Sequence, residues 1–202
     1  RGAAGRDRRD RPFLRMTTPT RPFRLAPFPG SAGTSGISVS GTVLRQSEAL
    51  AVRFEVTGNV GDIDIAPPVG APERRDKLWE ATCFEMFLGI PDSDAYLEFN
   101  LSPSHHWNAY RFDGYRKGMR NEPLLRELPF ATERTSERFS LSLELEISRL
   151  VRDRHPVSIG LTAVILMRNG TTTYWALSHT GPEPDFHRRD SFSLLLPAHE
   201  GA

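Results

Sequence analysis

The stretch from Phe139 to Ile147, FSLSLELEI, alternates apolar and polar residues at every position. Successive side chains of a β-strand point to opposite faces of a sheet, so this alternation predicts a strand with one buried face. The same period of two recurs along the chain. It predicts further strands at residues 37–43, 50–56, 83–90, 96–101, 107–113, 157–167, 171–179 and 191–196, and a short edge strand at 23–26.

Turn-forming residues separate these segments. Asn169-Gly170 is a strong signal for a two-residue hairpin, and the run from Pro91 to Asp94 predicts another turn. Residues 157–167 are apolar on both faces, which predicts a central strand. No sustained period of 3.6 residues competes with these patterns. The sequence therefore predicts an all-β fold, an antiparallel two-sheet β-sandwich of the immunoglobulin-like or jelly-roll type.

The composition indicates one globular domain. The chain has 202 residues, of which 38% are hydrophobic and 25% charged, and it is long enough to bury a core without a disulfide or a metal. Its single cysteine, Cys83, cannot form an internal disulfide. We assign residues 19–200 to one domain. We expect residues 1–18 to be a basic, disordered leader, which is not native if Met16 is the natural start.

Charge and hydropathy limit the partners. A formal net charge of +1 gives no global attraction to nucleic acid, although the arginines of residues 1–15 leave a nucleic-acid-binding arm as an alternative. The sequence contains no apolar run of about 18 residues and no apolar secretory segment. We therefore expect neither nucleic acid nor a membrane as a partner, and a cytoplasmic location. The pattern leaves the oligomeric state open.

Common catalytic and metal motifs are absent from the sequence. It contains no GxSxG, GxxxxGK[ST] or GxGxxG motif, and neither HExxH nor CxxC. We accordingly expect no catalytic residue, no metal site and no bound cofactor.

The candidate binding residues are those predicted to face away from the core. Trp79 and Glu80 precede the strand at 83–90, and a flat indole beside charged groups can stack on a sugar ring. The alternative is that Trp79 caps the core. Glu85 and, on the next strand, Glu98 and Asn100 are predicted to share the non-core face, where they would bind hydroxyl groups or form an ordinary solvated face.

Two C-terminal segments and one central segment add further candidates. Trp107 and Arg111 are predicted to share one face of their strand, with Arg111 placed to pair with Glu98 or Glu85. Trp175 and His179 share another strand face. Asp185 and His187 lie in the polar loop that follows, where the histidine could instead brace the loop.

Several segments together resemble the bacterial DOMON-like family, which is related to the family-nine carbohydrate-binding modules. They are DKLWEATCFEMFL at 76–88, YLEFNLSPS at 96–104, WNAYRFDGYR at 107–116, YWALSH at 174–179 and PDFHRRDSF at 184–192. The resemblance implies an antiparallel β-sandwich that binds sugar or, in other members, haem. It implies that Trp79 is an aromatic sugar contact, with Glu85 and Glu98 on matching strands and Trp107 and Trp175 as candidates for a second clamp.

We therefore expect a non-catalytic module that binds a carbohydrate or a similar polar small molecule on a concave sheet face. The first alternative is a haem-binding electron-transfer module, against which Met86 is predicted to face the core and Met119 and Met167 have no evident histidine partner. The second alternative is a hydrolase that uses Glu85 or Glu98 with His179 or His187, because paired carboxylates can perform acid/base catalysis.

Overall fold

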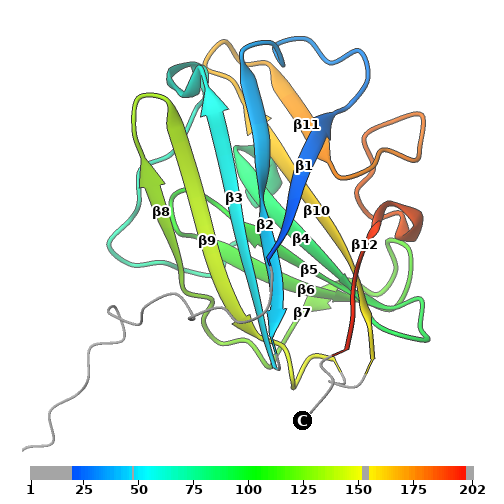
Figure 1. Cartoon of the computed structure of the whole chain (residues 1–202). Helices are drawn as coiled ribbons and strands as arrows, with labels where there is room; N and C mark the ends of the chain where they lie inside the picture. Colours follow the sequence, from blue (N-terminus) through cyan, green and yellow to red (C-terminus); the bar gives the residue numbers. More distant parts are fainter. Residues whose placement is uncertain (1–19, 47, 152–154, 199–202) are drawn as a thin grey trace, which may run out of the picture.

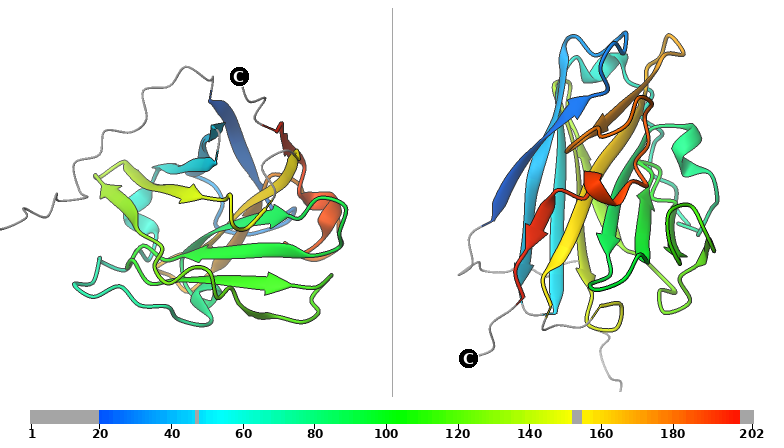
Figure 2. Two further views of the ribbon diagram at one scale, coloured as in Figure 1. Left: turned by 90° about the horizontal axis from the view of Figure 1, so that it is seen from below. Right: turned by 90° about the vertical axis from the view of Figure 1, so that its right-hand side faces the viewer.

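The computed structural model describes residues 20–46, 48–151 and 155–198, and these form two antiparallel layers that face each other (Figures 1 and 2). The first layer has the strand order β1-β2-β3-β9-β8, and the second has the order β7-β6-β5-β4-β10-β11 with β12 beside β10. The bounds in the first layer are β1 Arg21–Pro27, β2 Ile37–Gln46, β3 Ala49–Gly58, β8 Phe130–Arg134 and β9 Arg138–Glu146. Those in the second layer are β4 Cys83–Gly89, β5 Tyr96–Leu101, β6 Trp107–Phe112, β7 Arg120–Asn121, β10 Val157–Leu166, β11 Thr172–Ala176 and β12 Leu194–Leu196.

Strand β1 belongs to both layers. Residues 21–25 pair with β2 in the first layer, and Ala26 and Pro27 pair with β11 in the second. The two layers are therefore parts of one curled antiparallel sheet. A strand at 23–26 is confirmed, but the prediction that it lies at an edge is wrong: besides its sequence neighbour β2, it pairs with the distant strand β11, which its short apolar pattern could not reveal.

The predicted central strand is confirmed. β10 pairs with β4 along one side, and with β11 and β12 along the other. The hairpin at Asn169-Gly170 is also confirmed, but its loop has three residues rather than two. The backbone N–H of Met167 donates to the carbonyl of Thr171 at 2.8 Å, so residues 168–170 form the loop. Gly170 has φ of 85°, the left-handed conformation that such loops place at their last residue.

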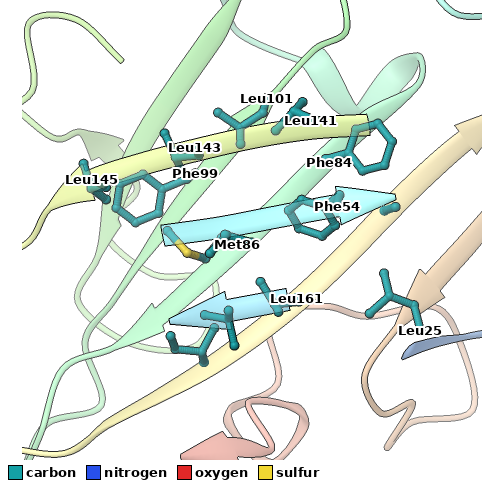
Figure 3. Packing of buried hydrophobic residues seen from close by; sticks show 14 of the residues in the cluster. Leu25, Phe54, Phe84, Met86, Phe99, Leu101, Leu141, Leu143, Leu145 and Leu161 are labelled. Atoms are coloured by element: carbon teal, nitrogen blue, oxygen red, sulfur yellow. The ribbon is translucent and has the colours of Figure 1, made fainter. Parts of the chain in front are cut away.

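The main core lies between the layers. Phe84 of β4 is stacked on Phe139 of β9 at 5.5 Å and lies 5.3 Å from Phe54 of β3, so these rings connect the layers directly. Met86 and Phe99 add to the same interior (Figure 3). The predicted alternation is confirmed here: Phe84, Met86 and Leu88 all face this core.

The structure adds elements that the pattern did not predict. The edge strand β8 has the sequence FATER, with two charged residues at its end and little apolar character, and β7 has two residues only. Within the described residues, the helical segments are the short 3-10 turns η2 (Val60–Asp62), η3 (Leu78–Glu80) and η4 (Arg189–Ser191), and none could cross a membrane. The leader predicted at residues 1–18 lies outside the described residues, as does Ser47.

Replacing Phe84 with alanine should lower the free energy of unfolding by roughly 3–5 kcal/mol, because the cavity would open where three rings from both layers meet. Chemical denaturation measures this loss. The control is Leu195→Ala on β12, whose side chain is 57% exposed and whose removal should cost less than about 0.5 kcal/mol. Equal losses in the two variants would contradict this account of the core.

Candidate functional site

The outer face of the second layer, which points away from the main core, carries a row of polar side chains. Strand register places Thr162 of β10 opposite Glu85 of β4, Glu85 opposite Asn100 of β5, and Asn100 opposite Asn108 of β6. Residues directly opposite on neighbouring strands share a face, so these four side chains form one line across the sheet. Glu98 lies in the adjacent row, opposite Tyr110.

This polar row is embedded in apolar side chains. The outer face carries a second buried cluster, separate from the main core. We call it the outer-face cluster, and its members are Phe87, Tyr96, Tyr110, Phe112, Val164, Ala176, Phe186 and Phe192, with Trp79 and Tyr174 packed against it. Strands β4 and β5 are consequently buried on both sides, and the predicted open sheet face is largely covered.

Glu85 and Glu98, the carboxylate pair, are held by short polar contacts. The hydroxyl of Thr162 donates to Oε2 of Glu85 at 3.1 Å, and the amide of Asn100 donates to Oε1 of Glu98 at 2.6 Å. Both glutamates are only 3% exposed. Expectation and structure therefore agree that Glu85, Glu98 and Asn100 lie together on the non-core face.

Burial changes the protonation of the pair. Desolvation, with the neighbouring charge of Glu98, raises the pKa of Glu85 to about 8, and the hydroxyl of Thr162 opposes this only in part. Desolvation also raises the pKa of Glu98 to about 7 against the stabilising amide of Asn100. Because burial disfavours the charged form and two nearby carboxylates repel each other, the pair retains protons at neutral pH.

A loop from the C-terminal part of the chain covers this face. Residues 177–193, the covering loop, follow β11 and are drawn in orange to red in Figure 1. The ring of His187 lies among Phe87, Tyr96 and Phe112 at centroid distances of 5.4, 5.9 and 5.2 Å. Its Nδ1 is in hydrogen-bond contact with the hydroxyl of Tyr96 at 2.8 Å. Burial and the charge of Arg116 lower the pKa of His187 to about 4, so the imidazole is neutral at pH 7.

Asp185 fastens the covering loop to the turn after β6. Its carboxylate accepts hydrogen bonds from the hydroxyl of Tyr115 at 2.5 Å and from Nη2 of Arg116 at 2.9 Å. It also accepts the backbone N–H of His187 at 3.1 Å. Asp185 therefore fixes the loop in the position that inserts His187 among the aromatic rings, and it does not itself contact the carboxylate pair.

Trp79 lies at the margin of the outer-face cluster. Its ring is partly exposed and meets the edge of Tyr110 at a centroid distance of 6.1 Å. The hydroxyl of Tyr110 donates to Oδ1 of Asp76 at 2.7 Å, and the amide of Asn108 donates to the same oxygen at 2.9 Å. Trp79 is thus a partly exposed ring that packs against Tyr110 at the edge of the outer-face cluster.

Arg74, which the sequence did not single out, holds this margin in place. Its guanidinium stacks over Trp107 at 4.3 Å and donates to Oδ1 of Asn108 at 2.7 Å. It also donates to the carbonyls of Ala109, Glu122 and Leu125 at 3.1, 3.3 and 2.5 Å. In the sequence Arg74 stands next to three other charged residues, and no alternation of apolar and polar positions marks it out. Only the tertiary structure shows that it binds Asn108 and three carbonyl groups.

Three predicted residues lie on the opposite side of the second layer. Trp107 and Trp175 belong to the main core, where the indole N–H of Trp175 donates to the hydroxyl of Thr173 at 2.9 Å. Arg111 pairs with the buried Glu122 at 2.7 Å, so the prediction that it pairs with Glu98 or Glu85 is wrong. Strand alternation places odd-numbered residues of β6 on the core side, whereas Glu98 and Glu85 point outward.

The remaining candidates lie at the periphery. Glu80 is exposed and pairs with Lys77 at 3.3 Å. His179 is at the beginning of the covering loop, where Nε2 contacts the carbonyl of Ala26 at 2.9 Å and the ring meets Phe28 at 5.2 Å. His179 is therefore held against β1 and the residue that follows it, and no described contact joins it to the carboxylate pair.

Open cavities occur elsewhere on the molecule. One of about 460 Å³ is lined by residues that include Ile90, Arg111 and Leu150, and another of about 590 Å³ is lined by residues that include Asn59 and Thr135. Neither includes the carboxylate pair. Among the described residues, no group of three or more His, Cys, Asp or Glu side chains could hold a metal ion.

Comparison with known proteins shows a fold rather than a family. No family model and no curated protein matches the sequence. A solved structure of a proposed carbohydrate-binding protein from Bacteroides uniformis is 12% identical, with a TM-score of 0.63 over 85% of this chain and 84% of that one. Two structures of a family-nine carbohydrate-binding module from Caldicellulosiruptor kristjanssonii, in complex with cellotriose and with glucose, give TM-scores of 0.48 and 0.47 at 13% and 14% identity. These cover 74% of this chain, and 70% and 72% of theirs.

Replacing Glu85 with glutamine should change how stability depends on pH. The raised pKa means that the folded protein binds more protons than the unfolded chain, so the free energy of unfolding falls as pH rises from about 4.5 to about 8. Glutamine cannot ionise, so between pH 5 and pH 9 the variant should lose less stability than the wild type, by roughly 2–4 kcal/mol. Urea denaturation at pH 5 and pH 9 measures the difference. His187 is present in both proteins, so its titration contributes to both. If the free energies of unfolding of the wild type and the variant change with pH in parallel, the expectation is contradicted.

Replacing Arg74 with lysine should lower the free energy of unfolding by roughly 2–3 kcal/mol. Lysine keeps the charge but cannot reproduce the planar set of donors, so partly buried carbonyl groups would lose their partners. The control is Arg75→Lys at the exposed neighbouring position, which should cost less than about 0.5 kcal/mol. If thermal and urea denaturation find both variants equally stable, Arg74 does not hold the margin of the site.

Proposed function

We propose that this protein is a non-catalytic module that binds a carbohydrate on the outer face of the second layer. The observation that carries the proposal is the partly exposed ring of Trp79 at the margin of this face, which meets the edge of Tyr110 and is flanked in sequence by the exposed charged residues Lys77 and Glu80. An aromatic face covers the apolar side of a sugar ring, and neighbouring amides and carboxylates bind its hydroxyl groups. The proposed carbohydrate binding of the Bacteroides protein, which shares the fold, supports this proposal.

The placement of the other candidates favours binding over the two alternatives. Met86 and Met167 are buried in the main core, so neither thioether can reach a haem on the outer face, and no described contact joins the exposed Met119 to a histidine. A hydrolase would need one ionised carboxylate at neutral pH with access to water. Here both glutamates have raised pKa values and lie at the base of a face covered by residues 177–193.

Replacing Trp79 with alanine should weaken saccharide binding by roughly tenfold or more, because the stacking surface would be lost. A glycan array with the wild-type protein identifies ligands, and isothermal titration calorimetry compares the variants. The control is Phe130→Leu, which alters a half-buried aromatic residue on the first layer. A blank array, or equal affinities of the Trp79→Ala and wild-type proteins, would overturn the proposal. Release of reducing sugar from a bound oligosaccharide would instead show a hydrolase.

A further inference from the structure

A cavity of about 460 Å³ lies where three segments of the chain meet. Its lining comes from the turn between β4 and β5, from β6, and from the connection between β9 and β10. None of the lining residues belongs to the polar row or to the outer-face cluster. The cavity is therefore distinct from the face that we propose for saccharide binding, and its volume is within the range of small-molecule sites.

One part of the cavity lining is apolar. Leu150 and Val151 are buried members of the main core, and Ile90 and Pro91 are partly buried. Transfer of an apolar group from water onto such a surface is favourable, because both lose contact with water. This part of the lining suits the hydrocarbon body of a small ligand.

Arg111 adds a positioned guanidinium group to the lining. Its Nε pairs with Oε2 of Glu122 at 2.7 Å, and Glu122 is only 1% exposed, so the ion pair holds the side chain in place. Within the described chain, no acceptor bonds to the two terminal nitrogens of Arg111. A guanidinium group binds a carboxylate through two parallel N–H···O bonds, so these nitrogens are available to such a ligand.

His155 supplies a second polar group without a partner. Its Nδ1 is buried and makes no hydrogen bond, and no described group bonds to its Nε2. Its backbone is held in place, because Nη1 of Arg45 donates to the carbonyl of His155 at 2.7 Å. A buried polar atom without a partner is costly, and a turn of this ring toward a ligand would break no hydrogen bond to the described chain. A ligand acceptor in the cavity would therefore satisfy a group that the chain leaves unpaired.

The charges of the lining limit the ligand further. Arg149 also lines the cavity, and it is exposed with no ion pair in the described chain. Asp92 is the one acid among the described lining residues, and it is exposed at the turn after β4. Because Asp92 and Glu122 offset the charges of the two arginines, the lining suits a ligand with one negative charge better than a phosphate dianion.

We propose that this cavity binds a small organic carboxylate with an apolar body. Arg111 binds the carboxylate, His155 contributes a further hydrogen bond, and the apolar body lies against Leu150 and Val151. Charge-assisted hydrogen bonds are roughly twice as strong as neutral ones, so a carboxylate is preferred over an alcohol of the same shape. The inference is independent of saccharide binding, because it concerns different residues.

An NMR titration of the full chain at pH 7 tests the proposal with three probes. Benzoate carries both the carboxylate and the apolar ring, benzyl alcohol lacks the charge, and acetate lacks the ring. We expect benzoate to bind at least about tenfold more tightly than either of the others. The backbone amide signals of Ile90, Leu150 and Val151 should shift on addition of benzoate, whereas that of Trp79 should not.

Three variants test the named residues. Arg111→Lys keeps a positive charge beside Glu122 but loses the paired terminal nitrogens, so the affinity for benzoate should fall at least about tenfold. Arg149→Gln removes an exposed charge and should weaken binding by a smaller factor, about two- to fivefold. The matched control is Arg24→Gln at an exposed position of β1, which should leave the affinity unchanged.

Equal binding of benzoate and benzyl alcohol, or no binding of benzoate, overturns the inference. So do benzoate-induced shifts confined to residues outside the cavity, and acetate binding as tight as that of benzoate. An unchanged affinity in Arg111→Lys also contradicts it, because the carboxylate would then have another partner. If that variant does not fold, the comparison of the three probes with the wild type and the effect of Arg149→Gln decide the outcome.

Discussion

The burial of β4 and β5 on both faces is the constraint on which the rest of the structure depends. Phe84, Met86 and Phe99 pack toward the first layer, while Phe87 and Tyr96 on the same strands pack toward the covering loop. Polar side chains between these outward aromatic residues are consequently removed from water. The hydrogen bonds of the polar row follow from this, because buried polar groups are tolerated only with partners.

Two contacts from outside the sheet maintain this arrangement. Asp185 anchors the covering loop through Tyr115 and Arg116, and Arg74 anchors the segment before β4 through Asn108 and three carbonyl groups. Both anchors depend on charge-assisted hydrogen bonds, which are stronger than neutral ones and specify geometry. The chemistry of the outer face therefore depends on residues that do not lie in the polar row itself, apart from Asn108.

The sequence predicts the strands and the two faces of each strand well, but it predicts poorly which distant segments cover those faces. Alternation identified nearly every strand and correctly divided Phe84, Met86 and Leu88 from Glu85 and Phe87, because the period of two is a local property. Which distant segment covers a face is not local. Neither the insertion of His187 among the rings of β4, β5 and β6 nor the pairing of Arg111 with Glu122 has a signature in the spacing of residues. The spacing of residues also could not show that Trp107 and Trp175, which we expected to be candidate binding residues, lie in the main core.

The pairing of strand β1 with β11 affects the order in which the sheet can form during folding. Strand β1 is the first described strand along the chain, yet its last residues pair with β11, about 150 positions later. Such a pairing closes a very long loop and can form only after nearly the whole chain is available, which is typical of slow-folding β-proteins. Until β1 and β11 have paired, β11 presents an unpaired edge, and such edges invite pairing with other chains. The short contact that unites the two layers is therefore also the one whose slow formation leaves a strand edge open to aggregation.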